Sequence, residues 1–217
     1  MNRQKMGSQP RIVGLYAIAD TDYLNKTRLL PAVGEAIAGG ARIIQYRDKS
    51  HDVPTRLAQA KKIVALCRQH GVLFIVNDDV ELAKQALTDG VHLGRMDASL
   101  IHARAQLGPK AHIGVSCYNE LTRALQAQTE GADYIAFGSF FPSLTKPGAV
   151  RADTELLRAA KQKLHIPIVA IGGITPENGA SLIAAGADAL AAIEGVFAQA
   201  DVLVAARRYA VLFADKA

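Results

Sequence analysis

The stretch Ala38-Gly39-Gly40-Ala41 separates an amphipathic segment from the apolar run Arg42 to Arg47, and this arrangement recurs along the chain. The other copies are Asp89-Gly90 before Val91 to Gly94, Glu130-Gly131-Ala132 before Asp133 to Gly138, Ala185-Gly186-Ala187 before Asp188 to Ile193, and a weaker His70-Gly71 before Val72 to Val76. Glycine readily takes the left-handed conformation that ends a helix. The nearly continuous apolar runs are typical of parallel strands buried on both faces. The repeat therefore predicts helices that alternate with buried parallel strands.

Three further apolar runs, Ile12 to Ala19, His112 to Val115 and Pro167 to Ile171, bring the number of expected strands to eight. Helical patterns are expected at Leu29 to Ala38, Pro54 to His70, Val80 to Leu87, Ala98 to Leu107, Glu120 to Glu130, Asp153 to Lys163, Pro176 to Ala184 and Val202 to Phe213. A repeat of about 25 residues is close to the unit of a compact parallel barrel. We therefore predict a single-domain α/β protein, a (β/α)8 TIM barrel over residues 11–217, behind a mobile tail at residues 1–10.

The main alternative to the barrel is an open, doubly wound parallel sheet. The first strand ends in Ala19-Asp20-Thr21 and is not followed by the glycine fingerprint of a dinucleotide-binding sheet. This ending weakens the alternative.

Composition narrows the function classes. Hydrophobic residues make up 50% of the 217-residue chain, enough for a large core, and the net charge of +5 is dispersed. A dispersed charge without tryptophan argues against nucleic acid and suits anionic small molecules. Two cysteines form neither a disulfide framework nor a zinc motif, which favours the cytoplasm. No apolar run is long enough to span a membrane. The sequence is compatible with a homo-oligomer and does not determine the oligomeric state.

Basic side chains follow the second expected strand, and in parallel barrels the catalytic groups gather at such strand ends. The two-residue period of a strand sends Gln45, Arg47 and Lys49 to the same side. The sequence therefore predicts a polar, doubly basic triplet in the barrel mouth. The alternative is a solvated strand end whose charges turn outward.

Acidic side chains follow the next two expected strands. Asn77, Asp78 and Asp79 come directly after one strand, and Asp97 lies just beyond the next. Two carboxylates from neighbouring strand ends are what Mg²⁺ prefers when it shares a substrate's phosphate oxygens, which points to Asp78 and Asp97. Helix capping is the alternative, for Asp79 and also for Asp97 before a helix that starts at Ala98. His92, inside an apolar strand, is predicted to be a core histidine.

The fifth strand end holds Ser116, which could reach a phosphate or a ring nitrogen, and Cys117, predicted to be a buried inert thiol. No strained Gly-x-Ser-x-Gly turn marks Ser116 as a nucleophile. The long loop from Gly138 to Gly148 holds hydroxyl groups and Lys146 and is predicted to bind a ligand, with a plain surface connection as the alternative.

Glycines also follow the seventh strand, as Gly172 and Gly173, and Thr175-Pro176 then begins a helix. A helix N-terminus with exposed amides receives phosphate, and the loops after strands seven and eight are the recurrent phosphate site of this fold. Ile193 and Glu194 at the end of the eighth strand are expected beside it.

Taken together, the motifs at successive strand ends resemble those of the thiamine phosphate synthase family over nearly the whole chain. The motifs are Gln45-Tyr46-Arg47-Asp48-Lys49, Val76-Asn77-Asp78-Asp79, Asp97, Gly114-Val115-Ser116, Pro142-Ser143-Leu144-Thr145-Lys146 and Ile171-Gly172-Gly173-Ile174-Thr175. The resemblance implies that a phosphorylated pyrimidine and a phosphorylated thiazole are joined, with Mg²⁺ as the cofactor.

The resemblance also implies roles for individual residues. Asp78 and Asp97 would hold the metal. Contacts to the pyrimidine pyrophosphate would come from Gln45, Arg47, Lys49, Asn77, Ser116 and Lys146, with Arg47, Lys49, Ser116 and Lys146 as the catalytic residues. Contacts to the thiazole phosphate would come from Ser143, Leu144, Thr145, Gly173, Ile193 and Glu194.

Two positions depart from the family pattern. Leu144 stands where the family often has a polar residue, and Glu194 where serines are common. A carboxylate is repelled by phosphate, so we expect Glu194 to turn its side chain away and to offer only its amide. A thiazole tautomerase of the same family and a non-catalytic phosphate-binding barrel are the alternative functions.

Overall fold

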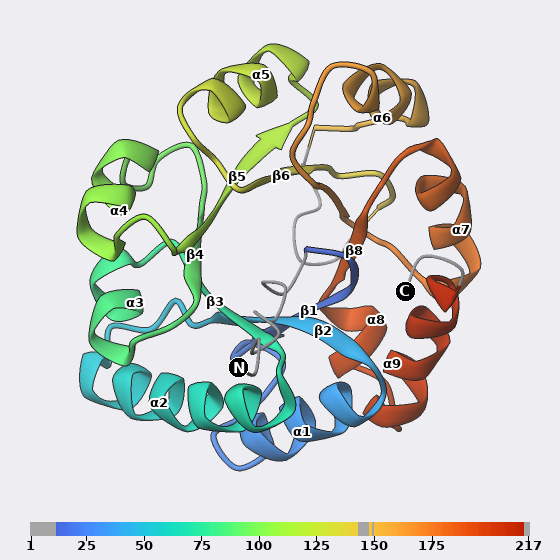
Figure 1. The fold of residues 1–217 in the computed structure, drawn as a ribbon. Helices are drawn as coiled ribbons and strands as arrows, with labels where there is room; N and C mark the ends of the chain where they lie inside the picture. Colours follow the sequence, from blue (N-terminus) through green and yellow to red (C-terminus); the bar gives the residue numbers. More distant parts are fainter. Residues whose placement is uncertain (1–11, 143–147, 149, 215–217) are drawn as a thin grey trace, which may run out of the picture.

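The structure is a computed structural model that describes residues 12–142, 148 and 150–214. A ring of strands is surrounded by a ring of helices (Figure 1). The expected N-terminal tail and the predicted site residues Ser143, Leu144, Thr145 and Lys146 lie outside the described residues.

Eight parallel strands close into a barrel in which each strand pairs with the next and β8 pairs with β1. The strands are β1 (Gly14–Asp20), β2 (Ala41–Arg47), β3 (Leu73–Asn77), β4 (Gly90–Leu93), β5 (His112–Tyr118), β6 (Tyr134–Phe137), β7 (Ile168–Ile171) and β8 (Ala189–Ala192). The predicted TIM barrel is therefore confirmed, and the open sheet is excluded.

Helices surround the barrel: α1 to α7 connect successive strands, and α8 and α9 follow β8. They are α1 (Leu29–Ala38), α2 (Val53–His70), α3 (Val80–Ala86), α4 (Leu100–Leu107), α5 (Leu121–Thr129), α6 (Thr154–Lys161), α7 (Pro176–Ala185), α8 (Glu194–Phe197) and α9 (Val202–Val211). The sequence patterns predicted all of these except α8, whose single turn is too short to show a helical period. None of the helices in the described part of the chain is long and apolar enough to cross a membrane.

The recurring glycines have two different roles. Positive φ angles occur at Gly40 (104°), Gly71 (65°), Gly131 (92°) and Gly186 (120°), as the helix-ending interpretation requires. At Gly90 that interpretation is wrong, because α3 already ends at Ala86 and its C-cap residue is Leu87, with φ 55°. A Cβ on Gly90 would lie 1.9 Å from the carbonyl oxygen of His112, so this glycine allows β4 and β5 to approach closely.

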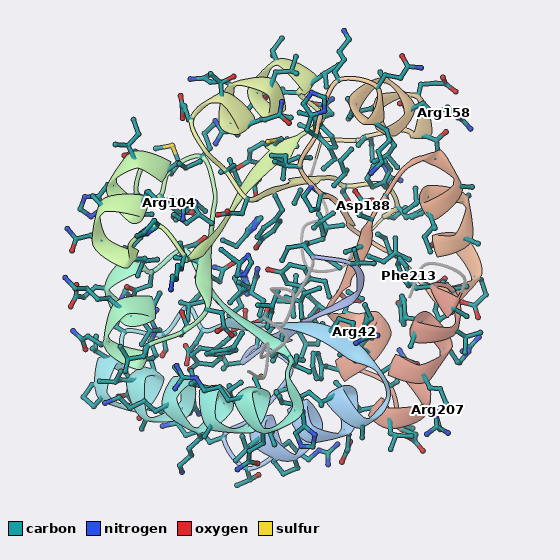
Figure 2. All side chains as sticks on the ribbon, viewed as in Figure 1. Arg42, Arg104, Arg158, Asp188, Arg207 and Phe213 are labelled. Atoms are coloured by element: carbon teal, nitrogen blue, oxygen red, sulfur yellow. The ribbon has the colours of Figure 1, made fainter. Side chains whose placement is uncertain are left out.

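The core has two layers, one inside the ring of strands and one between the strands and the helices. Tyr16, Ile43, Ile75, Tyr134 and Val169 belong to the inner layer and are at most 1% exposed. Side chains fill the space within the ring of strands (Figure 2). The barrel interior is thus packed, and ligands must bind at its mouth.

Aspartates tie neighbouring strands together at the end of the barrel opposite the mouth. Each carboxylate accepts a backbone N–H from the preceding strand: Asp89 from Phe74 (2.8 Å), Asp133 from Ile113 (2.7 Å) and Asp188 from Ile168 (2.9 Å). Arg104 pairs with Asp133 and Lys161 with Asp188 (Arg104 and Asp188 are labelled in Figure 2). We call Asp89, Asp133 and Asp188 the aspartate clamps. They join β3 to β4, β5 to β6 and β7 to β8.

Candidate active site

An acidic pair lies where β3 and β4 end. Asp78 follows β3 with φ 64°, and its backbone N–H donates to the carbonyl of His92 in β4 (2.8 Å). Asp97 accepts the backbone N–H of Gly94 (2.6 Å), and the Asp78 and Asp97 carboxyl groups hydrogen-bond to each other. The sequence therefore placed these two acids together correctly.

Helix capping was the alternative for Asp79 and Asp97, and it holds for Asp79 alone. Asp79 does cap α3, because its side chain accepts the N–H of Leu82 (2.9 Å). Asp97 does not cap a helix that starts at Ala98, since α4 begins at Leu100 and the hydroxyl of Ser99 accepts the N–H of His102 (3.2 Å). That alternative for Asp97 was wrong, and the Asp97 side chain is left to face Asp78.

The two carboxyl groups ionise unequally. Burial raises the pKa of Asp97, and the hydrogen bond and charge of Asp78 raise it further. Burial also opposes ionisation of Asp78, but hydrogen bonds with Asp97 and Lys49 outweigh this effect and lower the pKa of Asp78. Each acid therefore affects the ionisation of the other, and a cation held between them would relieve the repulsion of their charges.

The donor set fits Mg²⁺ better than zinc. The described residues contain no group of three or more histidine, cysteine, aspartate or glutamate side chains that could hold a metal ion. Mg²⁺ is commonly held by one or two carboxylates and completes its shell with waters and substrate phosphates. Asp78 and Asp97 supply that number.

Lys49 and Asn77 gather around the same acid. The Lys49 ammonium and the Asn77 amide both donate to Oδ2 of Asp78, the amide at 2.6 Å. The Lys49 side chain is 53% exposed, so it can exchange Asp78 for an incoming phosphate at little cost. Residues predicted from three separate motifs thus meet at one point.

Arg47 has a partner that the sequence interpretation missed. Its guanidinium donates to Oδ2 of Asp20 at 2.5 Å and lies 3.4 Å from Oδ2 of Asp22. The Asp20 side chain is 1% exposed and that of Arg47 is 18% exposed, so this is a largely buried ion pair. The signal was the position of Asp20 at the end of the first strand. The alternative of an outward-turned Arg47 is wrong.

A chain of hydrogen bonds crosses the barrel interior beneath these charges. The Gln45 amide Nε2 donates to the Tyr16 hydroxyl (2.7 Å), and that hydroxyl lies 2.9 Å from the Tyr134 hydroxyl. His92 connects Tyr134 to Ser116: its Nδ1 lies 3.2 Å from the Tyr134 hydroxyl and its Nε2 lies 2.9 Å from the Ser116 hydroxyl. We call these five residues the polar relay. Predicted to be a core histidine, His92 is indeed buried, but it also contacts Ser116, which the sequence interpretation missed.

Gly114 makes room for the centre of the polar relay. A Cβ at this position would lie 2.0 Å from Cζ of Tyr134, so only glycine lets the ring lie against β5. We expect Gly114→Ala to lower the free energy of unfolding by about 1 to 3 kcal/mol through overpacking. Chemical denaturation would measure this loss, and Gly148→Ala, where a Cβ meets nothing within 4 Å, is the control. Equal stability of the two variants would contradict the expectation.

The expected phosphate loop lies between β7 and α7. Gly172 and Gly173 have φ angles of 103° and 59°, and a Cβ on Gly173 would lie 2.2 Å from the carbonyl oxygen of Pro142. Asn178 braces the loop, since it accepts the N–H of Thr175 (2.8 Å) and donates to the carbonyl of Gly173 (3.0 Å). The loop therefore has a defined shape with the first amides of α7 at its end.

The end of β8 continues directly into the short helix α8, with Ile193 as its N-cap residue. The first amides of this turn have no earlier carbonyl to bind within the helix. The Glu194 carboxylate accepts a hydrogen bond from the Tyr23 hydroxyl (2.8 Å), so the loop after β1 holds it. This contact occupies the Glu194 side chain, and the role expected for its backbone amide stays a prediction.

Neither cysteine provides a nucleophile. Cys67 and Cys117 are both free thiols and fully buried, and burial raises the pKa of each to about 12. The prediction that Cys117 is buried is confirmed, and its raised pKa agrees with the inert thiol that the sequence predicts.

A family model described as thiamine monophosphate synthase matches residues 15–196. A thiamine-phosphate synthase of Thiobacillus denitrificans is 54% identical over 201 residues, which cover 93% of this chain and 95% of that protein. One from Nitrosococcus oceani is 51% identical over 198 residues, with 91% of each chain covered. These similarities extend over the whole barrel.

Among solved structures, a thiamine phosphate pyrophosphorylase from Pyrococcus furiosus superposes with a TM-score of 0.87 at 33% identity. The match covers 96% of this chain and 98% of that one. A 3-hexulose-6-phosphate synthase has a TM-score of 0.66 at 19% identity and shares the fold alone.

Proposed function

This chain belongs to the thiamine monophosphate synthase family, and from that membership we propose how its barrel mouth works. The protein is a transferase that joins 4-amino-5-hydroxymethylpyrimidine pyrophosphate to 4-methyl-5-hydroxyethylthiazole phosphate. The products are thiamine phosphate and pyrophosphate. The observation that carries the mechanism is the meeting of Asp78, Asp97 and Lys49 at neighbouring strand ends.

The charge of the leaving group is the main demand on the site. As the bond between the pyrimidine methylene and the pyrophosphate oxygen breaks, its electrons move to pyrophosphate. Arg47, Lys49 and Lys146 would stabilise the charge that develops there. The positions of Arg47 and Lys49 at the end of β2 support these roles, and Lys146 is proposed from the family motif.

The reaction requires no protein nucleophile and no strong base. The aminopyrimidine can support positive charge at its methylene, and the thiazole nitrogen that forms the new carbon–nitrogen bond carries no proton. The two buried thiols agree with this mechanism. Positioning the two substrates and stabilising charge would therefore suffice for catalysis.

Asp78 and Asp97 would hold Mg²⁺, with Asn77 and Lys49 orienting Asp78. When bound, the ion would neutralise pyrophosphate oxygens and so favour departure of the leaving group. Gln45 and Ser116 would contact the pyrimidine. The interaction between the two carboxyl groups supports this assignment, because a cation would relieve the repulsion between their charges.

A second half of the mouth would hold the thiazole phosphate. Its contacts would come from the Gly173 loop, the backbone of Ile193 and Glu194, and the segment from Ser143 to Thr145. The left-handed glycines and the start of α8 support the backbone contacts, since exposed amides bind phosphate. The single domain and the two reduced thiols support action in the cytoplasm on small molecules.

The decisive experiment mixes the purified protein with both substrates and Mg²⁺ and detects thiamine phosphate by the fluorescence of its oxidised form. We expect multiple turnovers that stop when the metal is chelated. Binding of both substrates without product would favour the non-catalytic barrel. Asp78 and Asp97 argue against the thiazole tautomerase, because that reaction has no pyrophosphate to release.

A further inference from the structure

The polar relay runs between two side chains of the proposed pyrimidine site, Gln45 in β2 and Ser116 in β5. The three residues between them, Tyr16, Tyr134 and His92, are at most 8% exposed. The rings of Tyr16 and Tyr134 lie 6.1 Å apart, and His92 stacks on Tyr134 at 5.5 Å. Packing therefore fixes the heavy atoms, and only the directions of the hydrogen bonds remain to be decided.

Each hydroxyl in the polar relay has a single proton, so the directions are linked. If Gln45 donates to Tyr16, then Tyr16 donates to Tyr134 and Tyr134 donates to Nδ1 of His92. His92 then carries its proton on Nε2 and donates to Ser116. The Ser116 hydroxyl proton is left to donate to a ligand, and Oε1 of Gln45 is left to accept from one.

If every hydrogen bond in the polar relay runs in the opposite direction, all the buried groups again have partners. The groups that Gln45 and Ser116 offer to a ligand are then exchanged. In this case Ser116 donates to Nε2 of His92, and Nδ1 of His92 donates to Tyr134. Tyr134 then donates to Tyr16, and Tyr16 donates to Oε1 of a Gln45 amide that has rotated by half a turn. Gln45 then offers a donor to the ligand and Ser116 an acceptor. When the His92 ring is neutral, any mixed arrangement leaves a buried hydroxyl proton without a partner among the described residues, which costs about 1 to 3 kcal/mol. The structure has Nε2 of Gln45 towards Tyr16, the first direction.

We propose that the polar relay couples the amide orientation of Gln45 to the hydroxyl direction of Ser116, so that its two ends together select an aminopyrimidine. The proposal rests on the proposed function. An amino group beside an unprotonated ring nitrogen offers one donor and one acceptor, which match Oε1 of Gln45 and the Ser116 hydroxyl. A 4-oxo ring with a protonated nitrogen has the reverse pattern and is rejected. Tyr16, Tyr134 and His92 are positioning residues.

The first test needs no substrate. Nitrogen NMR of protein labelled with ¹⁵N-histidine distinguishes the ring tautomers, and a His92→Gln sample assigns the His92 signals among the six histidines. We expect Nε2 of His92 to carry the proton and Nδ1 to carry none. A protonated Nδ1, in a neutral or a charged ring, would overturn the proposed direction.

The second test measures selectivity with two unreactive ligands, the phosphate monoesters of 4-amino-5-hydroxymethylpyrimidine and of its 4-oxo counterpart. Calorimetry in the presence of Mg²⁺ gives both dissociation constants. We expect the wild-type protein to bind the amino compound at least about 100-fold more tightly, and Tyr134→Phe to reduce this ratio at least about tenfold. The reason is that loss of the Tyr134 hydroxyl would break the chain of hydrogen bonds and release Gln45 and Ser116 from each other.

Tyr46→Phe is the matched control. Tyr46 is buried like Tyr134, but its hydroxyl hydrogen-bonds to Gln59 (2.5 Å) and Asp48 (2.9 Å), outside the polar relay. This variant should keep the selectivity ratio within about threefold of wild type. Weaker binding of both compounds with an unchanged ratio in Tyr134→Phe would overturn the proposal and leave a packing role.

Failure of the proposed function would look different, because calorimetry and NMR do not depend on turnover. A wild-type protein that makes no thiamine phosphate but still selects the amino compound would contradict the coupling activity and support the polar relay. If Tyr134→Phe does not fold, as judged by circular dichroism, the wild-type NMR result alone decides.

Discussion

Asp78→Asn should lower kcat/KM for thiamine phosphate formation at least about 100-fold, because it removes one of the two charges proposed to hold Mg²⁺ beside the leaving group. Asparagine suits this test better than alanine. It keeps the size of the side chain and tolerates the φ of 64° that the backbone has here. A higher Mg²⁺ concentration should restore part of the activity.

Asp79→Asn is the matched control, the same substitution one residue later. Asp79 caps α3 and pairs with Arg56 at 2.9 Å, and asparagine caps a helix about as well as aspartate does. Its kcat/KM should stay within about threefold of wild type. Near-normal rates in Asp78→Asn and in Asp97→Asn would remove the metal role from the acidic pair.

Arg47→Met should lower the free energy of unfolding by about 3 to 5 kcal/mol, because it leaves the buried Asp20 carboxylate without its partner. Methionine keeps much of the arginine volume, so the lost charge dominates the effect. Urea denaturation followed by circular dichroism would measure the change. Arg158→Met, which removes an exposed ion pair with Glu155 on α6, should cost at most about 1 kcal/mol.

A double variant separates the two roles of Arg47. Asp20→Asn removes the buried charge that Arg47 neutralises, so Arg47→Met/Asp20→Asn should regain most of the lost stability. Its kcat/KM should remain at least about tenfold below wild type, since the charge proposed to stabilise pyrophosphate is still missing. Recovery of activity together with stability would limit Arg47 to a structural role.

The barrel was predictable because its signals are local. Helix ends, glycines and apolar runs recur at a regular spacing, and each can be interpreted within a short stretch of sequence. Gly90 could not be interpreted from its local sequence, because it lacks a side chain to make room for the backbone of His112 on another strand. The short α8 was missed for a different reason, because a single turn shows no helical period.

The candidate site was partly predictable. Strand ends meet at one edge of a parallel barrel, so Lys49, Asp78 and Asp97 could be placed together from the sequence. The sequence did not predict the partner of Arg47. It also did not predict the hydrogen bonds that link Tyr16 through Tyr134 to His92. The link between Tyr16 and Tyr134 joins strands that are far apart in the sequence. Asp20, Tyr16 and His92 each resemble an ordinary core position when taken alone.

The aspartate clamps have a consequence for the order of folding. Their hydrogen bonds join residues only 15 to 20 positions apart, whereas closure of the barrel joins Gly14 to Ala189. Contacts close in sequence form quickly because little chain entropy is lost. We therefore expect the β3–β4, β5–β6 and β7–β8 pairs to assemble as separate local units, and the seam between β1 and β8 to form last. Pulse-labelled hydrogen exchange during refolding would then protect the amide of Ile168 before that of Gly14.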